Sequence, residues 1–420
     1  MISLIEALRY RCLEDIRQPL GPFHVLVGPN ASGKTTFLGV VSLLGRLVAD
    51  GLEAAVTEQS AVFSDLTWGR CGGSFELAVE ASIPEELRER LRTTAAETIR
   101  YEIEIGSDPA TGETSILAEK VLLLPRRDPI QQARLEFPKE GTVPRETILT
   151  AKARGGVRAV VNKVRGGNDN FYSEVTNGAG KGWVPAFKLG PRKSGLGNLP
   201  EDESKFPAST WLKRLLIEGV QPFVLNSLLI RKASPPGQTR RFKPDGSNLP
   251  WIVADLEKRH EERLRDWVSH LRTALPDLEA IRTIEREDDK HRYLVLRYSG
   301  GLEIPSWLAS DGTLRLLALT LPAYLPDLSG VFLIEEPENG IHPRAVESVL
   351  QSLSSVYGAQ VFAATHSPVI LGLVKPRDVL CFARTQEGAT DIVNGADHPA
   401  LRDWRGETDL GTLFASGILG

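Results

Sequence analysis

The chain has 420 residues and a formal net charge of −4. Hydrophobic residues make up 41% and charged residues 25%, which allows a substantial core and excludes a wholly disordered, collagen-like or disulfide-framework protein. Because the chain is mildly acidic, it is not a general polyanion binder, and contact with nucleic acid would need a local basic patch.

The N-terminal part of the chain predicts strands and one long helix. A short apolar strand at 24–27 precedes a helix from Gly33, in which apolar residues recur at spacings of three and four. Alternating apolar residues predict strands at 75–80 and 101–105. Residues 126–200 are rich in Gly and Pro and show little periodicity, which is typical of an exposed insertion.

The C-terminal part has a different pattern. Residues 254–275 predict a single amphipathic helix that Pro276 ends. Helices and apolar strands alternate over 300–380, and this alternation predicts a parallel sheet with helical crossovers. The fold class is therefore α/β, with a mixed sheet and an α+β insertion.

Cysteine usage and the N-terminus predict a cellular compartment. Cys12, Cys71 and Cys381 are far apart and form no CxxC pair, which is typical of a reduced protein without a cysteine metal cage. The first residues lack the basic start and apolar run of a signal peptide. No apolar stretch reaches the roughly 18 residues that a membrane span needs. We therefore expect a cytoplasmic protein.

The strongest motif is a phosphate loop between the first predicted strand and helix. It comprises Gly28, Pro29, Asn30, Ala31, Ser32, Gly33, Lys34 and Thr35, with Thr36 directly after it. The glycines allow backbone N–H groups to curl round phosphates, and the helix N-terminus adds partial positive charge. Lys34 would reach the β- and γ-phosphates, and the Thr35 hydroxyl would bind Mg²⁺. The motif predicts ATP and Mg²⁺ as ligands.

An apolar strand at 331–334 ends in Glu335 and Glu336, the Walker B pattern. The first acid would hold Mg²⁺ and the second would polarise the attacking water. The usual first acid is aspartate, and the longer side chain of Glu335 alters the metal geometry. Two solvated acids at the end of a buried strand are the alternative, which the phosphate loop disfavours.

Two further motifs follow the same logic. His366 ends a third apolar strand, and the carboxyl ends of parallel strands share one edge of a sheet, so it would lie beside the γ-phosphate. The alternative is a histidine that caps a turn. Ser310, Asp311 and Gly312 open an apolar helix. Ser310 is either a helix cap or a group that faces a nucleotide held by a second subunit.

The ordered set of motifs resembles the ABC-type ATPase head of the SMC, RecF and OLD families, often filed under AAA-family ATPases. Residues 310–313 look like its signature, 338–343 like its D-loop region, and His366 like its switch histidine. The motif-bearing parts cover about 1–80 and 240–375. For the lid-loop contact, Gln59 and the nearby 64–65 are weak candidates.

The resemblance implies a mechanism and partners. Two heads would pack head to tail around two ATP molecules, so that Lys34 and Glu336 of one chain face Ser310 and Gly312 of the other. His366, Lys34 and Glu336 would be the catalytic residues. The resemblance also implies three parts: an N-terminal lobe at 1–125, a basic insertion at 126–250, and a lid with the C-terminal lobe at 251–420.

Length separates the relatives within this group. The motifs lie too close together for a long SMC coiled coil, and we expect the stretch after His366 to be too short for an OLD nuclease domain. This favours a standalone ATPase switch that regulates a separately encoded effector, such as a nuclease or toxin, in bacterial anti-phage defence. A transporter subunit is disfavoured by the long insertion.

The alternative function is a RecF-like repair ATPase that binds DNA directly. Residues 151–200 contain nine Lys or Arg against two acids, with Phe171, Tyr172 and Trp183 interleaved. Such a stretch can bind nucleic acid, although a solvated insertion would look the same.

Overall fold

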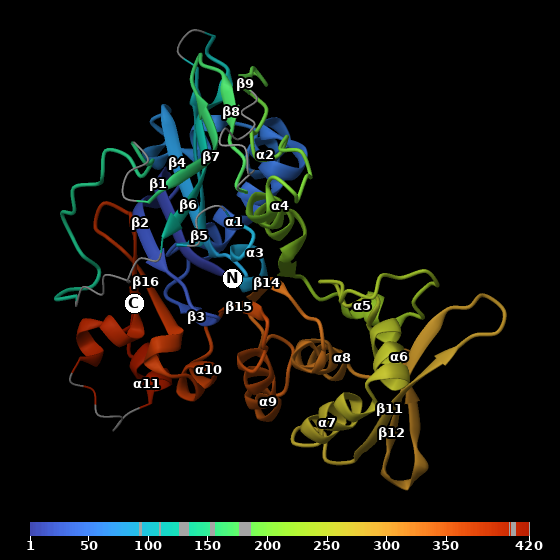
Figure 1. Ribbon diagram of the computed structural model, residues 1–420. Helices are drawn as coiled ribbons and strands as arrows, with labels where there is room; N and C mark the ends of the chain where they lie inside the picture. The colour runs from blue at the N-terminus through green and yellow to red at the C-terminus, as the bar shows by residue number, and fades with distance from the viewer. Residues whose placement is uncertain are drawn as a thin grey trace.

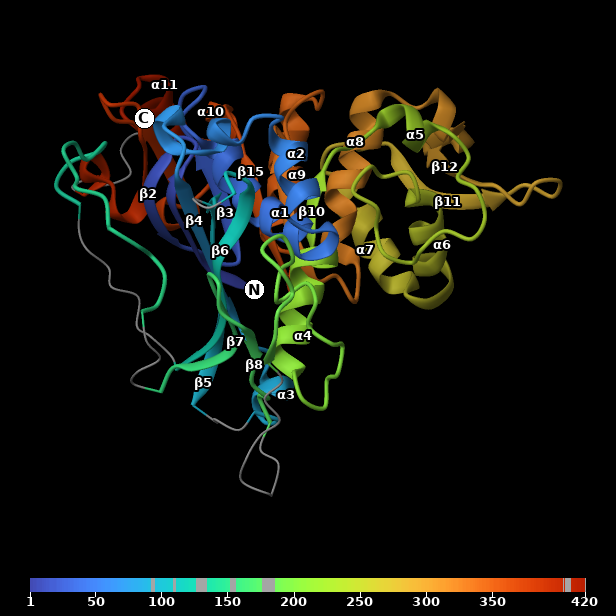
Figure 2. The same ribbon diagram turned by 90° about the horizontal axis from the view of Figure 1, so that it is seen from above.

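We describe the chain from a computed structural model, which covers residues 1–91, 95–108, 111–125, 134–151, 156–175, 186–402, 404 and 409–419. Two large sheets form the body of the molecule, and a smaller unit projects from it (Figures 1 and 2). None of the helices within these ranges combines the length and apolar character needed to cross a bilayer.

The first sheet is antiparallel and has eight strands. In spatial order they are β2 (Leu13–Pro19), β1 (Ile2–Tyr10), β4 (Ser74–Ser82), β5 (Ala96–Ser107), β6 (Thr114–Pro125), β7 (Arg158–Val164), β8 (Asp169–Phe171) and β9 (Ala186–Phe187). The last three strands come from the Gly/Pro-rich stretch, so part of the predicted insertion extends the N-terminal sheet. The three-part division of the chain itself stays a prediction.

The second sheet carries the predicted motifs. Its six strands are, in spatial order, β10 (Val220–Phe223), β14 (Gly330–Glu335), β15 (Ala359–Ala364), β3 (Phe23–Val27), β16 (Val379–Arg384) and β17 (Thr390–Asn394). All neighbours are parallel except β16 and β17. Strands β3, β14, β15 and β16 are mostly apolar and buried, as expected where helices cover both faces of a parallel sheet, whereas the edge strand β10 is mostly half-buried or exposed. The predicted α/β fold with a mixed sheet is confirmed.

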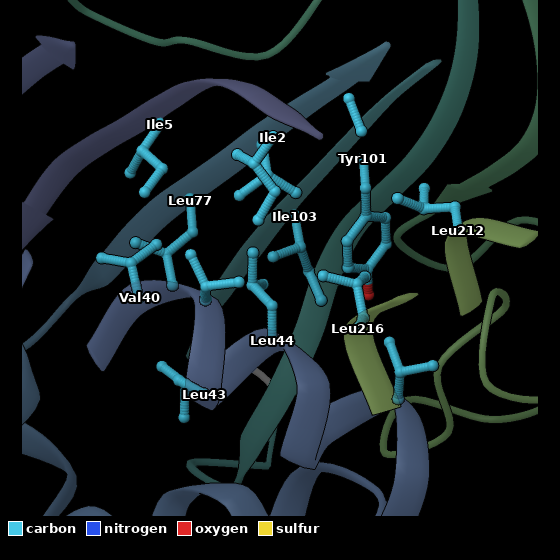
Figure 3. Close-up of a cluster of buried hydrophobic side chains, with 14 of the residues drawn as sticks. Ile2, Ile5, Val40, Leu43, Leu44, Leu77, Tyr101, Ile103, Leu212 and Leu216 are labelled. Atoms are coloured by element: carbon cyan, nitrogen blue, oxygen red, sulfur yellow. The ribbon is translucent and has the colours of Figure 1, made fainter. Parts of the chain in front are cut away.

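Helices pack on these sheets and join them. In chain order they are α1 (Lys34–Asp50), α2 (Leu52–Gln59), α3 (Glu85–Arg88), α4 (Pro207–Arg214), α8 (Asp311–Thr320), α9 (Pro343–Ser354), α10 (Pro368–Leu373) and α11 (Leu410–Ala415). Figure 3 shows how α1 lies against the first sheet: Val40 and Leu44 meet Ile5, Leu77 and Ile103 in one buried cluster. This packing fixes the start of α1, and with it the phosphate loop.

The projecting unit contains α5 (Ser227–Arg231), α6 (Leu249–Arg259), α7 (Glu261–Leu271) and a three-stranded sheet of β11 (Leu278–Glu285), β12 (Arg292–Tyr298) and β13 (Glu303–Pro305). The prediction of one helix over 254–275 is wrong. His260 takes a non-helical conformation with φ −140° and ψ 49° between α6 and α7. Basic residues end the first helix and acidic residues begin the second, as the helix dipole favours.

Buried His24 in β3 makes stability depend on pH. Its Nε2 accepts a hydrogen bond from the N–H of Gly21 at 2.7 Å, which requires an unprotonated nitrogen. Burial lowers its pKa from 6.5 to about 4. Between pH 6.5 and pH 4, His24 is therefore protonated in the unfolded chain but not in the folded chain. We expect the free energy of unfolding to decrease by about 3 kcal/mol because of His24 as pH falls from 6.5 to 4.

Urea denaturation of wild type and His24→Gln at several pH values tests this expectation. Because burial also lowers the pKa values of His270 and His398, the informative quantity is the difference between the two proteins. The wild type should lose more stability than the variant as pH falls. Parallel pH profiles would contradict the assignment.

Candidate functional site

The phosphate loop follows β3 and ends at the first turn of α1, as predicted. Gly28 and Gly33 have φ values of 148° and 100°, and Ala31 has a φ of 61°. A Cβ at Gly28 would lie 2.2 Å from the backbone oxygen of Phe382, and one at Gly33 would lie 2.3 Å from Oγ1 of Thr390. Both glycines are therefore required by conformation and by close packing.

The backbone of this loop fits a phosphate. The first amide of α1 that donates within the chain is that of Phe37, to the carbonyl of Gly33 at 2.8 Å. In the described part of the chain, no hydrogen bond is formed by the amides of Gly33, Lys34, Thr35 and Thr36. The hydroxyl of Ser32 is buried and also lacks a partner there. A group of unused donors at a helix N-terminus can bind an anion such as phosphate.

Lys34 is held over the loop. Its Nζ donates to the carbonyl oxygens of Gly28 at 2.8 Å and Pro29 at 2.9 Å. Burial lowers the pKa of Lys34, and the nearby carboxylate of Glu335 partly offsets that effect. The ammonium group is thus placed above the loop without a carboxylate hydrogen bond, where a phosphate could replace the two carbonyls.

The Walker B acids lie beside this loop. Because β14 and β3 flank β15 in the parallel sheet, their carboxyl ends share one edge. Oγ1 of Thr35 donates to Oε1 of Glu335 at 2.9 Å, so the two predicted metal ligands are in direct contact. Both side chains are exposed. A hydroxyl and a carboxylate are hard oxygen donors of the kind that Mg²⁺ prefers.

Glu336 and His366 complete the same edge. Glu336 has a φ of 47°, a conformation that non-glycine residues rarely take, and its N–H donates to the carbonyl of Ala364 at the end of β15. His366 is exposed and lies two residues beyond β15. The fold therefore brings together the strand ends that carry the predicted catalytic residues Lys34, Glu336 and His366.

The predicted signature lies elsewhere in the chain. Oγ of Ser310 accepts from the N–H of Thr313 at 3.1 Å and caps α8, and Asp311 pairs with Arg231. A Cβ at Gly312 would lie 2.8 Å from the carbonyl oxygen of Gly340. The signature thus contacts the predicted D-loop region. No hydrogen bond or ion pair within the described ranges joins it to the phosphate loop of the same chain.

Sequence reasoning missed residues that support the loop from behind. Thr390 of β17 donates from Oγ1 to the carbonyl of Ser32 at 3.0 Å, and Phe382 of β16 packs on Gly28. Glu338 accepts from Oγ1 of Thr365 at 2.6 Å and ties the D-loop region to the end of β15. The signal for Thr390 and Phe382 is weak, since both lie in ordinary strands with no motif. Gln59 ends α2, and its backbone carbonyl accepts from Arg11, so the lid-loop contact stays a prediction.

Several basic residues of the stretch at 151–200 form ion pairs or hydrogen bonds with other described residues. Lys163 is buried and pairs with Asp169 at 3.0 Å, and Arg158 donates to the carbonyl of Ser173. Arg165 and Arg192 pair with Asp108 and Glu113, whereas Lys188 and Lys193 are exposed. Lys152, Arg154, Lys181 and Trp183 lie outside the described residues. Phe171 is buried and Tyr172 half-buried. Direct DNA binding through this stretch stays a prediction.

The loop geometry yields a prediction with a matched control. Gly33→Ala should lower ATP affinity more than about tenfold, because the new methyl group must push Thr390 and the loop apart. Gly51→Ala is the control: Gly51 has a similar φ of 90° but nothing within 4 Å of an added Cβ. Calorimetric ATP titration of both variants separates the loop distortion from ordinary backbone strain. Equal ATP affinities in the two variants would contradict the prediction.

Comparison with known proteins agrees with this geometry. The sequence model of the family described as "AAA domain, putative AbiEii toxin, Type IV TA system" matches residues 23–372. A curated relative, the OLD nuclease of Thermus scotoductus, is 48% identical over 44 residues. That match spans 10% of this chain and only 8% of the relative's length.

Two solved structures have a similar fold. One is the Smc head bound to the C-winged helix domain of ScpA, with a TM-score of 0.53, 11% identity, and coverage of 93% of this chain and 97% of that one. The other is the Smc head domain from Pyrococcus furiosus, with an extended coiled coil, bound to the C-terminal domain of ScpA. It has a TM-score of 0.50, 13% identity, and coverage of 93% and 95%. The predicted head fold is confirmed.

Proposed function

We propose that this chain, which belongs to the AAA-domain family whose sequence model matches it, binds and hydrolyses ATP as a nucleotide-driven switch for a separately encoded effector. One observation carries the proposal. The phosphate loop, the contact between Thr35 and Glu335, and the residues Glu336 and His366 gather at one edge of a parallel sheet. Ligands bind at this edge in open α/β sheets.

Each residue there has a role that its position supports. Lys34 and the unused amides of the loop would bind the β- and γ-phosphates, while Thr35 and Glu335 would hold Mg²⁺. Bound Mg²⁺ supplies positive charge that stabilises the phosphoryl oxygens. Glu336 would accept a hydrogen bond from the attacking water and orient it, and His366 would donate to the γ-phosphate.

A second copy of the chain would complete the site through Ser310, Asp311 and Gly312. Among the described residues, no hydrogen bond or ion pair joins the signature to the phosphate loop of the same chain, and the N-terminal end of its helix is exposed. Large apolar side chains next to it are also exposed, Trp307 at 43% and Leu308 at 70%, with Leu228 of α5 at 69%. An exposed apolar cluster beside a functional motif is typical of a surface that another protein covers. This supports the head-to-tail homodimer.

The effector and the defence role rest on the relatives. The family description names a toxin of a type IV toxin–antitoxin system, and the curated relative is named an OLD nuclease. The two similar Smc heads are each bound to a domain of a separate protein, ScpA. By analogy, we propose that this head regulates a partner such as a nuclease or toxin in anti-phage defence.

Mixing inactive variants tests the shared site. Lys34→Ala and Ser310→Arg should each abolish ATP turnover. Their mixture should recover roughly a quarter of wild-type turnover, because half of the dimers are mixed and each holds one complete site. Steady-state phosphate release, with light scattering for mass, measures both the turnover and the assembly.

The matched control mixes Lys34→Ala with Glu336→Gln. Both changes lie on the same side of the proposed interface, so no arrangement yields a complete site and turnover should stay absent. Recovery in this control, or none in the first mixture, would contradict the head-to-tail arrangement. Turnover by Ser310→Arg alone would show that one chain suffices.

A further inference from the structure

A cavity lies at the end of the motif-bearing sheet opposite the phosphate loop. Its volume is about 740 Å³, and it is lined where Gly330 begins β14 and Gly358 precedes β15. Trp211 of α4 and Gln221 of β10 contribute from the body of the molecule, and residues of α6 contribute from the projecting unit. Gly330 lies five residue steps along β14 from Glu335, which is a separation of about 17 Å. The cavity is therefore distinct from the phosphate loop.

The inner wall of this cavity is apolar. Phe242, Leu256 and Phe332 line it and belong to one buried hydrophobic cluster that joins the projecting unit to β14. Trp211 is partly exposed. A volume of this size is within the range that holds a small organic molecule, and such sites favour the junction between structural units. Aromatic walls suit a flat or aliphatic body.

The rim of the cavity is rich in guanidinium groups. Arg214, Arg241 and Arg259 pair with Glu203, Glu218 and Asp255, but these side chains are largely exposed, so each pair contributes at most about 1 kcal/mol. Arg240 pairs with no acid in the part of the chain that the structure describes. A bidentate anion can take the place of such weakly paired carboxylates.

One polar atom in the wall also lacks a partner. Oε1 of Gln221 is enclosed and accepts no hydrogen bond within the described residues, while its Nε2 donates to the carbonyl of Glu218 at 3.2 Å. Native structures leave few enclosed acceptors unsatisfied.

We propose that this cavity binds a small anionic molecule with an apolar or aromatic body, at a site separate from the ATP site. The anionic head contacts Arg240 and Arg241 at the rim, and the body packs on Trp211 and Phe332. Because Phe332 lies in β14 three residues before Glu335, the molecule contacts the same strand that carries the Walker B acids.

Binding of anilinonaphthalene sulfonate, an aromatic anion that fluoresces in apolar sites, tests the proposal. The titration uses the full chain with saturating ADP and Mg²⁺, so that the phosphate loop is occupied. We expect saturable binding of one dye molecule per chain. The double variant Arg240→Glu, Arg241→Glu should weaken it by about tenfold or more, and Trp211→Ala should also weaken it.

The matched control is Arg282→Glu on β11, since Arg282 is also an exposed arginine paired with an acid, Glu303, but does not line the cavity. Its dye affinity should equal that of the wild type. Displacement by adenosine monophosphate indicates a phosphate head, and displacement by laurate indicates a carboxylate on an aliphatic body. Non-saturable binding, displacement by neither compound, or wild-type affinity in the double variant would overturn the proposal.

Discussion

Glu336→Gln should lower kcat for ATP hydrolysis by at least about a hundredfold, because glutamine keeps the size of the side chain but cannot accept the proton of the attacking water. ATP affinity should change little, since the phosphates are bound by the loop that contains Lys34. The variant should therefore accumulate as an ATP-bound dimer. Steady-state turnover and light scattering, with and without ATP and Mg²⁺, measure both effects.

Two further variants sharpen this result. Glu335→Gln should raise the Mg²⁺ concentration needed for activity, because it replaces a carboxylate in contact with Thr35 by a weaker neutral ligand. Glu347→Gln on α9 changes an exposed glutamate that accepts a hydrogen bond from Nε2 of Gln351, and its turnover should equal that of the wild type. Wild-type turnover in Glu336→Gln would remove Glu336 from the proposed mechanism.

Arg100→Met should destabilise the chain by about 3–5 kcal/mol at neutral pH, because it removes the buried cation that three carboxylates share and leaves Glu80 without an ion pair among the described residues. Arg100 is 5% exposed and contacts Glu6 at 2.6 Å, Glu80 at 2.9 Å and Glu102 at 2.7 Å. It also donates to the carbonyl of Ile148 at 2.9 Å. The network thus joins three strands of the first sheet to the segment that covers them.

The pH dependence of this variant has a defined sign. Burial alone would raise the pKa of Glu6, but Arg100 and Arg145 lower it below its usual value. In the wild type, the ion pairs of Glu6 stabilise the folded chain fully above the usual pKa of a glutamate. This stabilisation is lost as pH falls through the lowered pKa of Glu6. Without Arg100, the pKa of Glu6 should be higher than in the wild type, so Glu6 takes up a proton more readily and the buried negative charge is removed. The loss of stability in Arg100→Met relative to wild type should therefore shrink as pH falls from 7 to 5.

Urea denaturation of Arg100→Met at both pH values tests these expectations, and Arg46→Met is the matched control. Arg46 also contacts two acids, Asp50 at 2.5 Å and Glu58 at 2.9 Å, but its side chain is 50% exposed. Its loss should cost less than about 1 kcal/mol. Equal losses in the two variants would show that burial of the network contributes nothing.

The grouping of the proposed nucleotide-binding residues could be predicted from the sequence because its signals are local. A glycine-rich loop between a strand and a helix, and two acids at the end of an apolar strand, each occupy a few consecutive residues. The parallel sheet followed from alternating helices and apolar strands, and the shared edge of such a sheet then placed Glu335 near Thr35. The prediction of one helix over 254–275 was wrong because no local signal marks the break. The apolar period continues across His260, although the backbone leaves the helical conformation there.

The sequence alone thus determined the fold class and which motif residues gather at the carboxyl edge of the second sheet, since residue type and short spacing decide both. Only the tertiary structure decided which residues support the loop, because Thr390 and Phe382 reach it across the sheet from positions without a motif. It also showed that Lys163 and Arg165 are paired and that a guanidinium-rimmed cavity lies at the amino edge. Ion pairs and cavities depend on distances between segments far apart in the chain, and the composition of a segment does not specify those distances.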